Sequence, residues 1–125
     1  MLDGILELIP HARVGLIGLK REESTLRAHC YHQSLPKNLR RCEIILIDPM
    51  LATGGSAVAA IDFLRAQGAK NLRLVSLVAA PEGIRRVRKS HATLPIFTAA
   101  IDRQLNATGY ILPGLGDAGD RLFGT

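Results

Sequence analysis

Aromatic residues are scarce in this sequence, and tryptophan is missing altogether. Phenylalanine and tyrosine together make up 4% of the 125 residues. Proteins that bind single-stranded nucleic acid use aromatic side chains as platforms on which bases stack. The scarcity of such side chains therefore argues against a nucleic-acid-binding protein.

Long apolar runs and a cysteine framework are missing as well. No run reaches the roughly 18 apolar residues that a membrane-spanning helix needs. The N-terminal stretch MLDGILELIP carries Asp3 and Glu7 and has no basic region, unlike a signal peptide. The two cysteines, Cys30 and Cys42, fit no zinc or CxxC spacing. We therefore expect reduced thiols in a cytoplasmic protein that does not bind a membrane.

The charge is strongly positive and the composition is that of a folded protein. The formal net charge is +5, and hydrophobic residues make up 47% of the chain. This length and composition suit a single domain over residues 1–125. The positive charge favours an anionic partner, and the scarcity of aromatics favours a phosphorylated small molecule over RNA.

Apolar runs alternate with stretches of helical spacing along the chain. This alternation predicts an α/β fold with a mostly parallel sheet flanked by helices. The continuous apolar run at 14–19 is typical of a strand covered on both faces, and the polar stretch 22–36 suggests an arm or hairpin. We expect strands at 14–19, 43–47, 72–80, 94–100 and 110–112, and helices at 2–9, 56–67 and 82–89.

The stretch IILIDPMLATGGS joins a predicted strand to a predicted helix. In open α/β sheets, ligands bind beyond the carboxyl ends of the strands. The N–H groups of residues 52–56 and the N-terminus of the following helix suit a phosphate, and Gly54 and Gly55 allow its close approach. Ser56 can cap that helix. Asp48, just before this loop, would repel a phosphate but suits sugar hydroxyls, which indicates a sugar phosphate.

Other interpretations of this turn stay open. An ordinary strand–helix turn with a capped helix fits T-G-G-S equally well. Two common nucleotide-binding motifs are excluded, because the sequence contains neither GxxxxGK[ST] nor GxGxxG.

The segment DPMLATGGS, at 48–56, resembles the phosphoribosyl-pyrophosphate motif of uracil phosphoribosyltransferases. The C-terminal GYILPGLGDAGDRLFGT, at 109–125, is similar to the uracil-binding end of that family. LVAAPEGI at 77–84 and MLDGILELIPHARVGLIGL at 1–19 also match its pattern. The resemblance covers nearly the whole chain. It implies a type I phosphoribosyltransferase fold and the conversion of uracil and phosphoribosyl pyrophosphate to UMP and pyrophosphate.

The resemblance also implies a role for individual residues. Asp48 would contact the ribose hydroxyls, and residues 52–56 would hold the 5′-phosphate. Asp117 and Arg21 are the candidate catalytic residues, although no general base can be named. The expected phosphoribosyl-pyrophosphate site consists of Arg21, Asp48, Pro49, Met50, Leu51, Ala52, Thr53, Gly54, Gly55, Ser56 and Asp117. The expected uracil site consists of Ile111, Gly116, Asp117 and Ala118.

The family further implies Mg²⁺ with the pyrophosphate substrate, a GTP activator in some members, and a homo-oligomer. The family pattern extends upstream of the segment matching Met1 and includes an L-R-A-G loop around the pyrophosphate. We therefore expect an N-terminally truncated form with exposed apolar surface, and weak or no activity of this chain alone. A regulatory module that binds phosphoribosyl pyrophosphate without catalysis stays an alternative, and so does a basic RNA-binding protein.

Two further motifs have simpler explanations. His29-Cys30-Tyr31-His32 matches no strong metal site, so we expect an exposed arm there and no metal. The basic run at 85–89 is typical of a solvated helix face. Phe63 and Leu64 are expected in the core.

Overall fold

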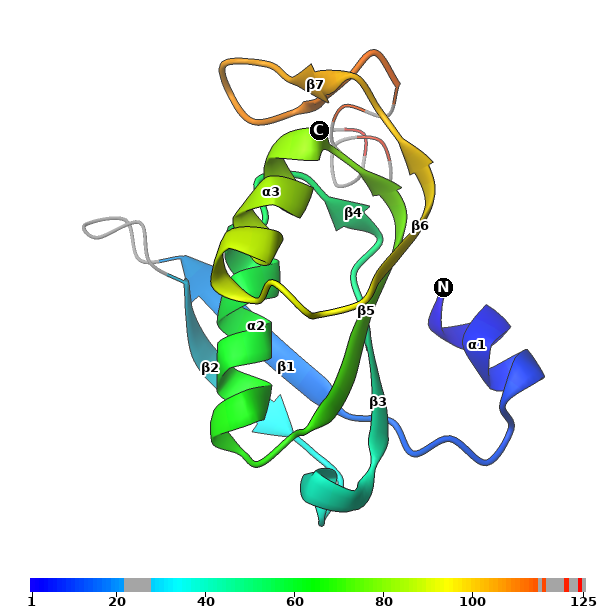
Figure 1. Ribbon diagram of the computed structural model, residues 1–125. Coiled ribbons are helices and arrows are strands. Elements are labelled where there is room, and N and C mark those ends of the chain that lie inside the picture. Colours follow the sequence, from blue (N-terminus) through cyan, green and yellow to red (C-terminus); the bar gives the residue numbers. More distant parts are fainter. Residues whose placement is uncertain (22–27, 115, 117–120, 122–123, 125) are drawn as a thin grey trace.

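A computed structural model describes residues 1–21, 28–114, 116, 121 and 124 of the chain (Figure 1). Its centre is a four-stranded sheet in which every pairing is parallel. Strand β5 is central: β3 and then β4 pair along one of its edges, and β6 pairs along the other. The predicted α/β fold with a mostly parallel sheet is confirmed. These strands are β3 (Glu43–Ile47), β4 (Met50–Leu51), β5 (Asn71–Ala79) and β6 (Ile96–Ile101).

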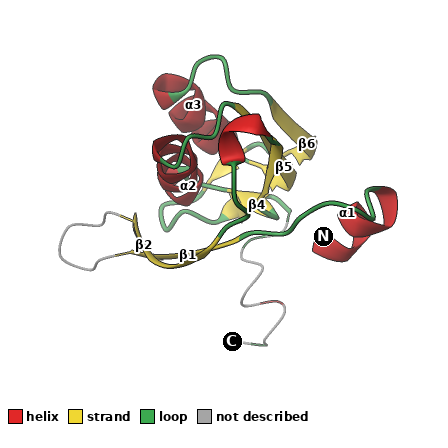
Figure 2. Cartoon of the chain, turned by 90° about the horizontal axis from the view of Figure 1, so that it is seen from below, coloured by secondary structure: helices red, strands yellow, loops and turns green. Residues whose placement is uncertain are grey.

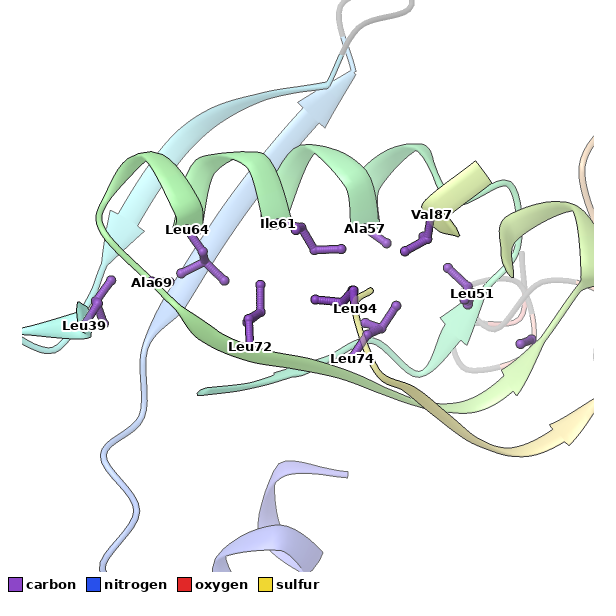
Figure 3. Packing of buried hydrophobic residues seen from close by; sticks show 11 residues of the cluster. Leu39, Leu51, Ala57, Ile61, Leu64, Ala69, Leu72, Leu74, Val87 and Leu94 are labelled. Carbon is purple, nitrogen blue, oxygen red and sulfur yellow. The ribbon is translucent and has the colours of Figure 1, made fainter. Parts of the chain in front are cut away.

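Two helices, α2 (Gly55–Ala66) and α3 (Pro81–Ser90), cover one face of this sheet, as Figure 2 shows. They pack against each other, and their buried side chains share one hydrophobic core with those of β5. Apolar residues recur along α2 at helical spacing and face β5, so the buried stripe holds helix and sheet together (Figure 3). Fully burying a side chain such as Ile61 or Leu74 stabilises the fold by about 2 kcal/mol. Leu64 belongs to this core, and Phe63 is half-buried.

The apolar run 14–19 forms a strand as predicted, but the expectation that both faces of this strand are covered is wrong. The strand there, β1 (Leu16–Arg21), pairs antiparallel with β2 (Ala28–Ser34) in a separate two-stranded sheet. Val14 and Leu16 are 46% and 58% exposed. The run is apolar because several of its side chains line a wide hollow, described below, and not because a sheet covers both faces. From the sequence, the polar stretch 22–36 is expected to form an arm or hairpin. The hairpin is confirmed, because β2 lies in this stretch and pairs antiparallel with β1.

Strand β3 is also less buried than predicted. Glu43 and Ile45 are exposed, because β3 forms one end of the sheet and is paired on one side within the described residues. The remaining elements are short and lie outside the central sheet. They are α1 (Leu2–Leu8), the 3-10 turn Leu39–Arg41, and the antiparallel pair β7 (Gln104–Leu105) and β8 (Ile111–Leu112).

Within the described part of the chain, no helix is both long enough and apolar enough to cross a membrane.

Candidate functional site

Asp48 follows directly on β3, at the carboxyl end of that strand and beside the middle of β5. Its N–H donates to the carbonyl of Val75 at 3.1 Å, which fixes the backbone to β5. Its carboxylate Oδ1 accepts a hydrogen bond from the N–H of Met50, also at 3.1 Å. Burial raises the pKa of the Asp48 carboxyl above its usual value, and the hydrogen bond from Met50 partly opposes that rise. The chain therefore holds a half-buried carboxylate in a fixed orientation at this edge.

The three residues after Asp48 are tied into the sheet. The Pro49 carbonyl accepts from the N–H groups of both Leu77 and Val78, at 3.2 Å each. Met50 and Leu51 form β4 along β5, and the Leu51 side chain is 1% exposed in the core. Their placement supports the loop that follows them, and the buried Leu51 side chain has no room for direct contact with a ligand.

The loop and the first turn of α2 carry a row of backbone donors. The N–H of Ala52 is used by the Met50 carbonyl at 3.1 Å, and the N–H of Val58 by the Gly54 carbonyl at 3.0 Å. Between them, the N–H groups of residues 53–57 have no acceptor within the described part of the chain. Successive unpaired N–H groups at a helix N-terminus form a concavity that suits an anion.

Ser56 does not cap α2, contrary to the sequence prediction. The N-cap is Gly54, at φ 76° and ψ 0°, and no side chain caps the helix. A glycine adopts this left-handed conformation without steric cost, so the helix begins one residue earlier than predicted. The side chain of Ser56 is exposed and its hydroxyl stays available to a ligand.

The two loop glycines face α3. A Cβ atom at Gly54 would lie 2.8 Å from the Gly83 carbonyl oxygen, and one at Gly55 would lie 3.4 Å from Arg86 Nη1. From the sequence, both glycines are expected to allow the close approach of a phosphate. The positive φ expected of such a turn is present at Gly54, but the close neighbour at each glycine is α3.

The C-terminal segment lies against the same loop. A Cβ atom at Gly109 would lie 3.3 Å from Thr53 Cγ2, so the turn before β8 touches the candidate phosphate loop. Asn106 shapes that turn: its Oδ1 accepts from the N–H of Thr108 at 3.0 Å and the N–H of Tyr110 at 2.8 Å. Sequence reasoning missed Asn106 and Gly109, although N-A-T-G is a recognisable turn sequence.

The predicted uracil segment closes on itself. Ile111 and Gly116 exchange two backbone hydrogen bonds, of 3.3 and 3.0 Å, across a short loop. The Ile111 side chain is fully buried, which anchors that loop to the body of the protein. Gly114 lies close to the carboxylate of Asp102, which follows β6: a Cβ atom at Gly114 would stand 2.7 Å from Asp102 Oδ2.

Three further residues predicted for the site, Arg21, Asp117 and Ala118, are not placed beside the candidate phosphate loop by the described structure. Asp117 and Ala118 lie outside the described residues. Arg21 is the last residue of β1, opposite Ala28, and belongs to the hairpin rather than to the central sheet. Their predicted roles stay predictions.

A hollow of about 840 Å³ opens beside the site. Aliphatic side chains of α1, β1 and β3 form most of its wall, and it reaches Asp48 and Ser56. The expected exposure of apolar surface is thus present along β3, where Ile45 is 38% exposed.

Comparison with known proteins identifies the family of this chain. A family model described as uracil phosphoribosyltransferase matches residues 1–125. The chain belongs to the uracil phosphoribosyltransferase family. Curated relatives named uracil phosphoribosyltransferase include proteins of Levilactobacillus brevis, 57% identical, and Paracoccus denitrificans, 58% identical, each over 125 residues. The matches cover 100% of this chain but 60% and 59% of these relatives. The chain therefore spans about three fifths of their length.

Solved structures share this fold. The AQ2163 protein of Aquifex aeolicus is 42% identical, with a TM-score of 0.85 over 98% of this chain and 59% of its own. An adenine phosphoribosyltransferase of Leishmania donovani has a TM-score of 0.51 at 18% identity, covering 94% of this chain and 56% of its own. The latter likeness concerns the fold alone, and it agrees with the predicted phosphoribosyltransferase fold.

Proposed function

We propose that the chain carries the substrate-binding parts of a uracil phosphoribosyltransferase, which converts uracil and phosphoribosyl pyrophosphate to UMP and pyrophosphate. The observation that carries the proposal is the contact of Gly109 with Thr53. It brings the segment expected to bind uracil against the loop expected to bind the 5′-phosphate. A reaction that joins a base to a phosphorylated ribose needs these two parts side by side.

Each part of the donor has a suitable group in this arrangement. The unpaired N–H groups of residues 53–57 suit the 5′-phosphate. The Asp48 carboxylate can accept hydrogen bonds from the ribose hydroxyls. Asp48 thereby fixes the sugar whose anomeric carbon reacts, and Pro49, Met50 and Leu51 support it from the sheet.

The proposed reaction mainly requires stabilisation of the charges that develop as the bond breaks. Cleavage of the bond at the anomeric carbon builds positive charge on the ribose and negative charge on the pyrophosphate. Fixed donors stabilise such charge without a covalent intermediate. We propose Arg21 on the pyrophosphate side and Asp117 near the ribosyl donor, as the family motifs imply. Uracil would be recognised by backbone groups of the loop that contains Ile111, Gly116 and Ala118.

Mg²⁺ is compatible with the donor set of this site. The described residues contain no cluster of three His, Cys, Asp or Glu side chains that could hold a metal ion. Mg²⁺ commonly keeps several waters and binds through substrate phosphates with one or two carboxylates. Asp48 is the carboxylate beside the donor, and the ion would neutralise charge on the pyrophosphate. Activation by GTP, a homo-oligomeric state and a cytoplasmic location stay predictions.

A second candidate function is a binding module that retains phosphoribosyl pyrophosphate but does not catalyse. The observation that favours it is that Asp48 and the N–H groups of residues 53–57, which suit donor binding, lie together, whereas the candidate catalytic residue Arg21 belongs to the hairpin. RNA binding is the weakest alternative, because aromatic residues make up only 4% of the chain and offer few platforms on which bases could stack.

The test is UMP formation by the purified 125-residue chain with uracil, phosphoribosyl pyrophosphate and Mg²⁺. Turnover that falls at least tenfold in Asp48→Asn supports the enzyme. Binding of phosphoribosyl pyrophosphate without turnover favours the binding module. A chain that neither turns over nor binds the donor contradicts both candidate functions.

A further inference from the structure

Arg86 of α3 lies over the start of α2. A Cβ atom at Gly55 would stand 3.4, 3.5 and 3.6 Å from Nη1, Cζ and Nη2 of Arg86. The end of the guanidinium group therefore lies within van der Waals range of the Cβ position of this glycine. The Arg86 Cβ in turn lies 3.3 Å from the Cβ position of Gly54.

The position of Arg86 is held by the backbone on which it stands. Gly83, three residues earlier on α3, packs on the carbonyls of Leu51 and Ala52 and leaves no room for a Cβ. The first turn of α3 is thus fixed against the candidate phosphate loop. Since Arg86 is one helical turn after Gly83, its side chain starts from the same face of α3.

Among the described residues, the charge of Arg86 has no ion-pair partner. Its neighbour Arg85 approaches Glu82, with Nη2 3.9 Å from Oε1. For Arg86, no carboxylate within the described part of the chain lies within ion-pair distance, and its side chain is exposed. An unpaired guanidinium beside unpaired N–H groups makes a site of one sign of charge, which favours a bound anion.

We propose that Arg86 is a phosphate-binding residue, which contacts the 5′-phosphate of the donor from α3 while the N–H groups of residues 53–57 hold it from the loop. This inference rests on the proposed function, since it adds a residue to the same site. The guanidinium fork can donate two parallel hydrogen bonds to phosphate oxygens. The 5′-phosphate does not change during the reaction. Its contact with Arg86 therefore contributes to binding and not to the chemical step.

The direct test is the affinity for ribose 5-phosphate, measured by isothermal titration at low salt. This probe has the 5′-phosphate but lacks the pyrophosphate. We expect Arg86→Ala to bind it about tenfold more weakly than the unaltered chain, as for loss of a hydrogen bond to a charged group. Arg86→Lys keeps the charge without the fork and should fall between the two.

The matched control is Arg88→Ala, which removes the same charge from the same helix. Arg88 is exposed, and the atoms nearest to the Cβ positions of Gly54 and Gly55 come from Gly83 and Arg86 instead. We expect this variant to retain the affinity of the unaltered chain within about twofold. Thermal unfolding of each variant shows whether the fold is kept, and an exposed arginine should not be needed for it.

Three outcomes overturn the inference. Equal binding by Arg86→Ala and the unaltered chain would show that the phosphate does not touch Arg86. An equal loss in Arg86→Ala and Arg88→Ala would assign the effect to the general positive charge of α3. In both cases ribose 5-phosphate still binds to the unaltered chain, so the proposed function stands. If the unaltered chain bound neither ribose 5-phosphate nor phosphoribosyl pyrophosphate, the proposed function would fall together with the inference.

Discussion

Gly83 stands so close to the carbonyl oxygen of Ala52 that a Cβ atom could not fit between them. The same Cβ would lie 2.9 Å from the Leu51 carbonyl oxygen. Real Cβ atoms do not approach backbone oxygens this closely, and neither carbonyl belongs to a flexible side chain. The fold of the candidate phosphate loop therefore depends on a glycine of a different helix.

Gly83→Ala should destabilise the protein for this reason. Overpacking of this kind costs about 3 kcal/mol in unfolding free energy, because α3 or the loop must move. Urea denaturation measures the loss, and Gly4→Ala in α1 is the matched control, since nothing lies within 4 Å of its Cβ position. The control should be neutral or stabilising by up to about 1 kcal/mol. A Gly83→Ala variant as stable as Gly4→Ala would refute the contact.

Asp48→Asn should make the folded chain more stable at neutral pH. Burial raises the pKa of Asp48, so the folded state binds its proton more tightly than the unfolded state does. Between the usual carboxyl value and the raised value, unfolding stability therefore falls as the pH rises. Asparagine keeps an acceptor for the Met50 N–H but has no charge to bury.

The stability difference between Asp48→Asn and the unaltered chain should shrink as the pH falls through the raised pKa of Asp48. Unfolding free energies measured from neutral pH down to about pH 4 would reveal it. A constant difference across this range would show that the Asp48 carboxyl titrates in the folded state as it does in the unfolded state.

Asn106→Ala should loosen the turn that touches the phosphate loop. The lost acceptor serves the N–H groups of Thr108 and Tyr110 and the Thr108 hydroxyl, which is 2.8 Å away. These hydrogen bonds are exposed, so we expect a loss of about 1 kcal/mol in unfolding free energy, measured by urea denaturation. Asn106→Asp keeps an acceptor oxygen and should recover most of that stability. If Asp and Ala at this position were equally destabilising, the acceptor would not be what shapes the turn.

Ile45→Lys should reduce self-association of the chain. Within the described residues β3 has an unpaired edge, and exposed apolar edges promote aggregation. We expect the concentration-dependent light scattering to fall while the unfolding free energy changes by less than about 1 kcal/mol. Ile44→Lys, on a side chain that packs against the core, is the contrasting variant and should cost about 2 kcal/mol or more. Unchanged scattering in Ile45→Lys would show that this edge does not mediate association.

Much of the central sheet could be predicted from local patterns. The range 43–47 matches β3, and the predictions for β5, α2 and α3 are within two residues of the observed bounds. These elements are buried on at least one face, so their sequences have the apolar runs or the helical spacing by which they can be recognised. The run at 14–19 is equally apolar but forms one strand of an antiparallel hairpin. Composition alone cannot show whether an apolar run is buried inside a sheet or lines a hollow.

The site was predictable where a motif is contiguous. Asp48 and the loop after it stand at the carboxyl ends of the strands, as the general rule for α/β sheets predicts. The helix start was misjudged because the serine that resembles a cap follows a glycine that can adopt positive φ. The contacts of Gly109 with Thr53 and of Arg86 with Gly55 join distant segments, so no local signal in the sequence could reveal them.

The most direct test of the central claim is the binding of phosphoribosyl pyrophosphate, in the presence of Mg²⁺, to the purified 125-residue chain and to Asp48→Asn. Isothermal titration should show one donor molecule bound per chain, with affinity at least tenfold lower in the variant, because a hydrogen-bonded carboxylate is lost. Absence of binding to a folded, unaltered chain, or equal binding by both proteins, would contradict the assignment of the donor to the Asp48 loop.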